Sequence, residues 1–260
     1  LGRSAWSSHP VASWPHWARR HKTWSLFSGV GLLDFALHPW CQTIGYVENN
    51  PAAVEILRQR MGDGALDDAP IQADVRVAQP PAGVEVLVAG FPCQDTSGAG
   101  QKRGLDGNRT PLVAEVFRLC DVTGCKAVFL ENVDGLRSRS AVWHAVLSEL
   151  STRGFFCRWV SLACSQVGAP QRRWRWFCLA CRGDFELFAD PLENVPELPD
   201  SPLDFYGGRP APDRWLTQAP YDSVGKRLCL LGNAVVPQQG AIAARLLARQ
   251  QRDGSLRGLF

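Results

Sequence analysis

Short apolar runs alternate with amphipathic helical patterns along most of the chain, and this alternation is the strongest constraint on its fold. We expect strands at 23–27, 44–48, 71–74, 84–90, 127–132, 155–163 and 174–181, and helices at 51–61, 110–120, 140–154 and 237–250. Such alternation favours a doubly wound α/β fold, with a mostly parallel sheet and helices on both faces. Sheets of this kind bind ligands beyond the carboxyl ends of their strands, so the residues after each strand are the first candidates for a site.

The segment 183–225 interrupts this alternation, because it is rich in Pro, Asp and Gly and contains little that would build a core. We therefore expect a leader or linker at 1–22, a main domain at 23–182, a short acidic Pro-rich lobe at 183–225, and a closing segment at 226–260 that returns to the main domain.

The net charge of +3 is too small to indicate a nucleic-acid partner by itself, but the charge is unevenly distributed. Residues 153–182 contain six arginines and no acidic residue, whereas residues 184–204 contain seven acidic residues and no Lys or Arg. A basic face is therefore expected only before residue 183.

The nine cysteines form no even, regular framework, which indicates free thiols in a reducing, intracellular compartment, cytoplasm or nucleus. No signal peptide and no apolar run of membrane-spanning length is present in the sequence, so no membrane partner is expected. Cys178 and Cys181 have C-x-x-C spacing, but structural zinc sites usually have two such pairs, so we predict no metal site. A start at Leu1 instead of Met fits a fragment of a longer protein.

Polar or glycine residues follow each of the first three predicted strands. Gly29 and Gly31 form a turn that lets backbone N–H groups approach a ligand closely. Glu48 ends the second strand and has the acceptor atoms that two ribose hydroxyls require. Asp74 closes the third strand, where it can accept from an adenine amino group. Solvated strand ends would explain each residue singly, but three in succession favour a nucleoside site.

The glycine turn departs from the pyrophosphate-binding pattern G-x-G-x-x-G, because Asp34 occupies the third glycine position. An acid that faces the start of a helix would repel a pyrophosphate. The predicted cofactor is therefore a nucleoside without phosphates, S-adenosylmethionine instead of NAD.

Cys93 follows the strand at 84–90 in the stretch "GFPCQDTSGAG", which places its thiol at a strand end and not in the core. A thiol becomes a strong nucleophile when a nearby positive charge favours its thiolate. Arg173 and Arg175, at alternate positions of a strand, would point to the same face and are the candidate cations. Glu131 ends a central strand, where partial desolvation would raise the pKa of its carboxyl group and allow it to donate a proton near neutrality.

The sequences "LFSGVG", "VEN", "FPCQ", "LENV", "QRRWR" and "GNAVVPQ" occur in an order and spacing that resembles the cytosine-C5 DNA methyltransferases, over about residues 23–180 and 226–250. The resemblance implies a Rossmann-like sheet with a small target-recognition lobe, and S-adenosylmethionine as the cofactor, with S-adenosylhomocysteine as the product. It implies methyl transfer to C5 of cytosine in DNA.

The resemblance also implies the roles of the catalytic residues. Cys93 would attack C6 of a cytosine flipped out of the duplex, and Glu131 would bind the exocyclic amine and N3 of that base. Arg175 would hold O2, and Arg173 would support the loop or contact a phosphate.

The remaining implied contacts concern the cofactor and DNA. The implied cofactor-binding residues are Phe27, Ser28, Gly29, Gly31, Glu48, Asn49, Asp74, Val75, Leu112 and Asn233. The implied DNA-binding residues are Gln94, Ser97 and Arg109. Phe27 and Leu112 would also be core residues in any α/β fold.

Two features depart from the family pattern. Ser25 stands where the family often has Asp, and Leu32 where it often has Gly, which would weaken cofactor binding. The acidic lobe at 183–225 is a poor candidate for reading bases in the major groove, which usually requires Arg or Lys. Either specificity is short and loose, or another domain or chain supplies it.

Three alternatives to a DNA methyltransferase stay open. The tRNA-modifying branch shares these motifs, although its Cys-Phe-Thr tripeptide is absent here. A catalytically silent domain that binds DNA or a partner methyltransferase is disfavoured by the intact catalytic set. A Rossmann oxidoreductase is disfavoured by the same set and by Asp34. The sequence does not predict an oligomeric state.

Overall fold

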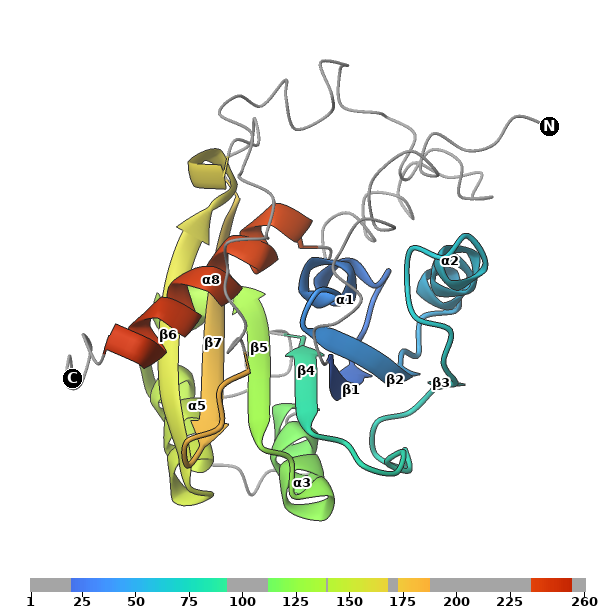
Figure 1. Ribbon diagram of the computed structural model, residues 1–260. Coiled ribbons are helices and arrows are strands. Elements are labelled where there is room, and N and C mark those ends of the chain that lie inside the picture. Colours follow the sequence, from blue (N-terminus) through green and yellow to red (C-terminus); the bar gives the residue numbers. More distant parts are fainter. Residues whose placement is uncertain (1–19, 93–111, 139, 168–172, 188–234, 254–260) are drawn as a thin grey trace.

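The computed structural model describes residues 20–92, 112–138, 140–167, 173–187 and 235–253 of the chain (Figure 1). Seven strands of this region form one sheet in the order β3-β2-β1-β4-β5-β7-β6. The strands are β1 (His21–Leu26), β2 (Cys41–Val47), β3 (Ile71–Gln72), β4 (Val86–Gly90), β5 (Ala127–Val133), β6 (Phe155–Ala163) and β7 (Trp174–Arg182). The helices are α1 (Leu32–Leu37), α2 (Pro51–Gly62), α3 (Leu112–Thr123), α4 (Gly135–Ser138), α5 (Ser140–Thr152) and α8 (Pro237–Asp253), with a 3₁₀ turn at Cys164–Val167.

The strand directions determine which residues meet at the functional edge of the sheet. Strands β1 to β5 pair in parallel, whereas β7 is antiparallel to both β5 and β6. The first residues of β7 therefore lie beside the last residues of β5, and Arg175 is paired in register with Val133. The carboxyl ends of β1, β4 and β5 and the start of β7 share one edge.

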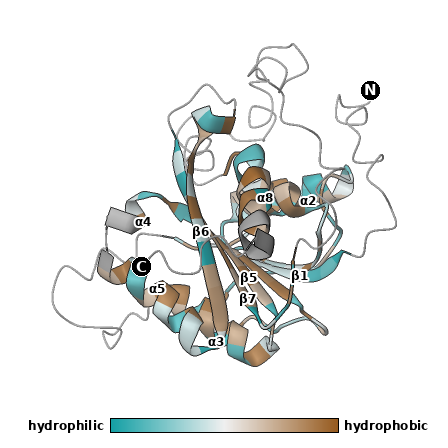
Figure 2. Ribbon diagram, turned by 60° about the vertical axis from the view of Figure 1, so that its left-hand side comes forward, coloured by the Kyte–Doolittle hydropathy of each residue, from teal (hydrophilic) through white to brown (hydrophobic). Residues whose placement is uncertain are grey.

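Helices cover both faces of the sheet. In Figure 1, α8 crosses in front of β5, β7 and β6, while α3 and α5 lie behind the sheet. Two separate apolar clusters follow from this arrangement, one between the sheet and α3 with α5, the other between the sheet and α1 with α8. Figure 2 shows that β5 and β7, which lie between these layers, are mostly hydrophobic along their length. The doubly wound α/β fold expected from the sequence is confirmed.

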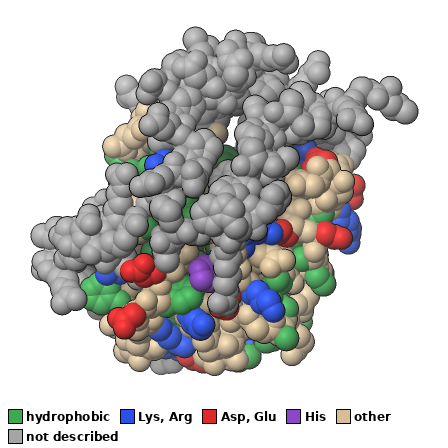
Figure 3. Space-filling model, viewed as in Figure 1, with side chains coloured by type: hydrophobic (Ala, Val, Ile, Leu, Met, Phe, Trp, Pro, Cys, Tyr) green, Lys and Arg blue, Asp and Glu red, His purple; other side chains and the backbone are tan. Residues whose placement is uncertain are grey.

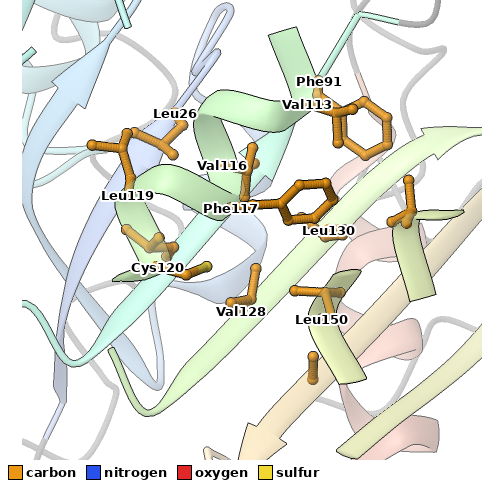
Figure 4. Packing of buried hydrophobic residues seen from close by; sticks show 14 of the residues in the cluster. Leu26, Phe91, Val113, Val116, Phe117, Leu119, Cys120, Val128, Leu130 and Leu150 are labelled. Atoms are coloured by element: carbon orange, nitrogen blue, oxygen red, sulfur yellow. The ribbon is translucent and has the colours of Figure 1, made fainter. Parts of the chain in front are cut away.

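Helix α3 shows how the sequence pattern produces one of these layers. Val113, Val116, Phe117 and Cys120 recur at the i, i+3, i+4 spacing of a single helical face, and all four are buried. Figure 4 shows this face turned toward apolar side chains of the sheet, among them Leu26, Val128 and Leu130.

Most predicted elements agree with the structure within a few residues. Strand β1 begins at His21, two residues before the predicted start, and is preceded by Arg20, whose Nη2 donates to Oδ1 of Asp67 at 2.7 Å. Strand β3 is reduced to two residues. The antiparallel direction of β7 and the short helix α4 were not predicted. The expected leader and lobe fall mostly, and the expected closing segment partly, outside the described residues.

Among the described residues, no helix is long and apolar enough to cross a membrane. Figure 3 shows Lys, Arg, Asp and Glu side chains interspersed over the described part of one face of the molecule. On that part of the surface, charge of one sign does not gather into a broad field.

Gly31 is required where the turn after β1 enters α1. Its φ of 78° lies in the left-handed region, and a Cβ added there would clash with Leu66 Cδ1 and come within 2.9 Å of Leu57 Cδ2. Gly29 also has a positive φ, 56°, but a Cβ there would meet nothing within 4 Å. The first glycine leaves open space, whereas the second allows α1 to pack closely.

Replacement of these two glycines by alanine should therefore have unequal effects on stability. Gly29→Ala pays only for the left-handed backbone, about 1–2 kcal/mol. Gly31→Ala adds overpacking against two leucines, for a total of about 2–5 kcal/mol in the free energy of unfolding. Urea denaturation of both variants checks this, and equal losses would contradict the packing role of Gly31.

Candidate active site

The turn after β1 is held by a carboxylate from β2. Gly29 N–H and Asn50 N–H each donate to one oxygen of Glu48, both at 2.7 Å. Ser28 N–H donates to the carbonyl of Val47 at 3.1 Å, and Phe27 adopts a φ of 54°, unusual for a residue with a side chain. The ends of β1 and β2 are thus fastened together in a locally strained backbone.

This turn fits the sugar and amino-acid parts of a nucleoside cofactor. Space is open beside Gly29, where a Cβ would meet nothing within 4 Å. Glu48 is partly exposed, and each of its oxygens accepts one backbone hydrogen bond and so retains a further lone pair for a ribose hydroxyl. Asn49, which follows Glu48 in the sequence, is exposed.

The predicted adenine end shows a more complicated arrangement. Both oxygens of Asp74 accept from Arg76, at 2.7 Å from Nη2 and 2.9 Å from Nε, and these bonds lower the pKa of Asp74 to about 2. The carboxylate is thus ionised and oriented by Arg76. Val75 is buried in the core on the α3 side of the sheet, and Leu112 and Phe27 pack against the same core, as the structural alternative for these two residues anticipated.

Asp34 does not face the ligand side of the turn, so the predicted repulsion of a pyrophosphate was based on a wrong position. Its carboxyl group is 4% exposed and accepts from Ser25 Oγ at 3.0 Å and Thr43 Oγ1 at 3.4 Å. Burial raises the pKa of Asp34 from 3.8 to about 7. Ser25, which departs from the family pattern, is therefore a buried donor to this acid.

The central feature of the edge is an ion pair between β5 and β7. Arg175 Nε lies 2.7 Å from Oε1 of Glu131, and both side chains are nearly inaccessible to solvent. Burial raises the pKa of Glu131 from 4.5 to about 7, although the charges of Arg175 and Arg173 oppose that rise. Glu131 and Arg175 thus lie in contact at this edge, and Arg173 is near enough for its charge to act on the acid.

The carboxyl group of Glu131 extends toward the end of β4. A Cβ placed on Gly90 would lie 3.3 Å from Glu131 Oε2 and 3.8 Å from the carbonyl oxygen of Phe27. A side chain at this position would be in tight contact with the acid, so the glycine gives the carboxyl group room beside β4. The carboxyl group of Glu131 therefore lies beside Gly90, which precedes Cys93 by three residues in the sequence.

Asn132 was missed by the sequence analysis as a functional candidate. Its side chain is 3% exposed, and its Nδ2 donates to the carbonyl oxygen of Phe91 at 2.9 Å. Its own Oδ1 accepts from Val133 N–H at 2.8 Å. Asn132 thus fixes the backbone that leads from β4 to Cys93, from a position next to Glu131. No local pattern reveals a bond between residues 41 positions apart.

Five predicted site residues, Cys93, Gln94, Ser97, Arg109 and Asn233, lie outside the described residues. The seven described cysteines form no disulfide. Over the described ranges, no group of three His, Cys, Asp or Glu side chains is placed to hold a metal ion.

Comparison with known proteins identifies the family. Residues 21–205 match the family model described as C-5 cytosine-specific DNA methylase. The chain belongs to this family. The resemblance seen in the sequence motifs is thereby confirmed, and methyltransferases of this family use S-adenosylmethionine.

The matches to individual relatives cover different shares of the relatives' length. The type II methyltransferase M.CviJI of Paramecium bursaria Chlorella virus IL3A is 30% identical over 84% of this chain and 57% of its own. The type II methyltransferase M.AquIA of Picosynechococcus is 28% identical over 75% of this chain and 86% of its own. A solved DNMT2 mutant from Spodoptera frugiperda, 21% identical, has a TM-score of 0.53 over 70% of this chain and 56% of its own, which supports the fold. The chain thus spans little more than half of M.CviJI and of that DNMT2 chain.

The raised pKa of Glu131 predicts a pH-dependent stability. Because burial disfavours the ionised form, the folded state loses stability as the pH rises from about 4.5 through about 7, by up to about 3 kcal/mol. Asp34 contributes in the same direction. In Glu131→Gln, the free energy of unfolding should fall less steeply between pH 5 and 8, as measured by urea denaturation at several pH values.

The absolute stability of Glu131→Gln also reflects the lost ion pair, so the slope is the informative quantity. The matched variant Glu55→Gln, on α2 away from this edge, should retain the wild-type slope. An unchanged slope in Glu131→Gln would show that Glu131 does not titrate in this range.

The bond from Asn132 predicts a second stability effect. Asn132→Leu keeps the approximate size of the side chain but leaves the Phe91 carbonyl without its donor, which should cost about 1–3 kcal/mol. Asn49→Leu, at an exposed position, should change the free energy of unfolding by about 0.5 kcal/mol or less. Thermal unfolding of both variants tests the difference, and equal effects would contradict the anchoring role.

Proposed function

We propose that this protein transfers a methyl group from S-adenosylmethionine to C5 of cytosine in DNA, with Cys93 as the covalent nucleophile. The observation that carries the proposal is the buried Glu131–Arg175 pair at the edge where β4 leads to Cys93. Membership of the C-5 cytosine-specific DNA methylases supports it.

The chemistry requires a nucleophile and an acid on one pyrimidine ring, because C5 of cytosine is a weak nucleophile. The Cys93 thiolate forms a bond to C6, and the electron pair displaced from the 5,6 double bond makes C5 nucleophilic. Glu131, in its protonated form, donates to N3 and so stabilises the negative charge that develops on the ring. Its pKa of about 7 makes both protonation states available near neutral pH.

S-adenosylmethionine, when bound, supplies a methyl group activated by a positively charged sulfur. Glu48 and the turn at Gly29 hold the cofactor's ribose and amino-acid parts, and Asp74 holds the adenine amino group. After C5 has accepted the methyl group, loss of the C5 proton restores the double bond, and the Cys93 Sγ–C6 bond breaks with its electron pair returning to sulfur.

Arg175 and Arg173 complete the site electrostatically. Their charges limit the rise in the pKa of Glu131, which would otherwise be too weak an acid to lose its proton again. We assign to Arg175 the further role of holding O2 of the base. Since none of these groups reaches a base inside a stacked duplex, the cytosine has to be flipped out, at a cost of a few kcal/mol.

We further propose that part of the DNA specificity comes from another domain or chain. The part of the lobe at 184–204 contains seven acidic residues and no Lys or Arg. Direct reading of bases in the major groove usually requires Arg or Lys, so this composition supports a separate source of specificity.

Methyl transfer is tested directly by incubating the protein with tritium-labelled S-adenosylmethionine and duplex DNA, single-stranded DNA or tRNA. We expect label in DNA, its loss in Cys93→Ala, and near-wild-type labelling in the matched variant Cys157→Ala on β6. DNA containing 5-fluorocytosine should trap a covalent adduct with the wild type and with Cys157→Ala only, because the fluorine cannot leave as a proton does.

Two results would contradict the proposal. Label in tRNA alone would assign the activity to RNA. Absence of label and of adduct with every nucleic acid would indicate a binding domain without catalysis.

A further inference from the structure

The C-terminal helix contributes one fully buried polar side chain to the region behind the catalytic arginines. Gln239, in the first turn of α8, has no solvent exposure. Its Nε2 donates to the carbonyl oxygen of Leu162 at 2.8 Å and to that of Arg173 at 3.0 Å. Both amide hydrogens are thus used, and the reverse orientation of the amide would place its oxygen against two carbonyls.

The two acceptors lie on the two sides of the β6–β7 hairpin. Leu162 is near the end of β6, in register with Arg175, and Arg173 directly precedes β7. Cys164 N–H also donates to the Arg173 carbonyl, at 2.8 Å. Gln239 therefore bridges the two strands at the loop end of the hairpin.

The position of α8 makes this anchor rigid. Gly240, the next residue, lies so close to α1 that a Cβ would come within 3.0 Å of Ala36 Cβ and 3.3 Å of Leu33 Cδ1. Ala243, Ala244 and Leu247 continue the buried face of the helix. A helix packed this closely on α1 has little freedom to shift, so the amide of Gln239 is a fixed point for the hairpin backbone.

Arg173 and Arg175 reach Glu131 from this backbone. Arg175 Nε is 2.7 Å from the acid, and both arginines affect the charge of the acid. A displacement of the hairpin end would move both guanidinium groups relative to Glu131 without touching the cofactor turn at Gly29 and Glu48, which is built from β1 and β2.

We propose that Gln239 is a positioning residue, which couples the C-terminal helix to the catalytic arginines by fixing the hairpin that carries them. It does not contact the substrate itself, and its effect passes through Arg173 and Arg175. The inference rests on the proposed methyltransferase function.

The test uses two variants of the full chain and one control. Gln239→Met retains the length of the side chain without hydrogen-bond donors, and Gln239→Glu retains its polar shape but replaces the amide donors by a carboxylate. Gln42→Glu, at an exposed position on β2, is the matched control. We measure kcat per cofactor-binding site, the Kd for S-adenosylmethionine, and the pH profile of kcat.

We expect kcat to fall about tenfold or more in both Gln239 variants, since the Leu162 carbonyl loses the Gln239 donor and the Arg173 carbonyl keeps only the Cys164 N–H. The cofactor Kd should change by about twofold or less, because the turn at Gly29 is unaffected. In Gln239→Met, the alkaline limb of the pH profile should move to higher pH, since arginines that have moved away no longer oppose the raised pKa of Glu131. Gln42→Glu should match the wild type in all three measurements.

A purely structural role would lower the number of binding sites and leave kcat per site and the pH profile unchanged, and that result would overturn the inference. Loss of cofactor affinity in step with kcat would overturn it as well. An inactive wild type would instead refute the proposed function, so the two failures are distinguishable.

Discussion

The proposed site depends on the carboxyl group of Glu131, which is buried from solvent beside the guanidinium group of Arg175. Desolvation favours the neutral form of Glu131, whereas Arg175 at 2.7 Å favours the ionised form. The two effects together give Glu131 a pKa of about 7. Neither effect alone would suit the chemistry. A solvated glutamate would be ionised at pH 7, and a buried glutamate without a cation would hold its proton too firmly.

The fold produces this balance through strand direction. Because β7 is antiparallel, its first residues lie beside the last residues of β5, and the arginine enters the edge from the opposite direction to the acid. Gly90 on β4 leaves the space into which the carboxyl group extends. Two buried side-chain amides donate to backbone carbonyls on either side of this pair. Asn132 bonds to Phe91, after β4, and Gln239 bonds to Leu162, on β6. The relative positions of Glu131 and the arginines are thus set by the backbone that carries them.

Much of this arrangement could be predicted from local patterns. The alternation of apolar runs with helical periodicity predicted the layers of the sheet. The strand ends singled out Glu48 and Glu131 as candidates, and the alternate spacing within a strand singled out the two arginines. The direction of β7 was within reach, since no helix separates it from β6 and adjacent strands without a crossover pair in antiparallel fashion.

Other features have no local signature. Asn132 and Gln239 bond to carbonyls far away in the sequence, so only the folded chain shows their partners. Asp34 was assigned to the ligand side because it occupies the third glycine position of the pyrophosphate-binding pattern, whereas the structure buries it with Ser25 and Thr43. Here the correct cofactor class was reached through an incorrect reason.

The central claim is that Glu131 titrates near neutrality in the folded protein. Carbon-13 NMR of the side-chain carboxyl groups of the full chain, with Glu131→Gln to assign the signal, measures this directly. We expect an apparent pKa of about 7 for the signal that disappears in the variant. A value at or below the ordinary 4.5 would show that the group is a solvated or fully paired carboxylate, and the account of the site would be wrong.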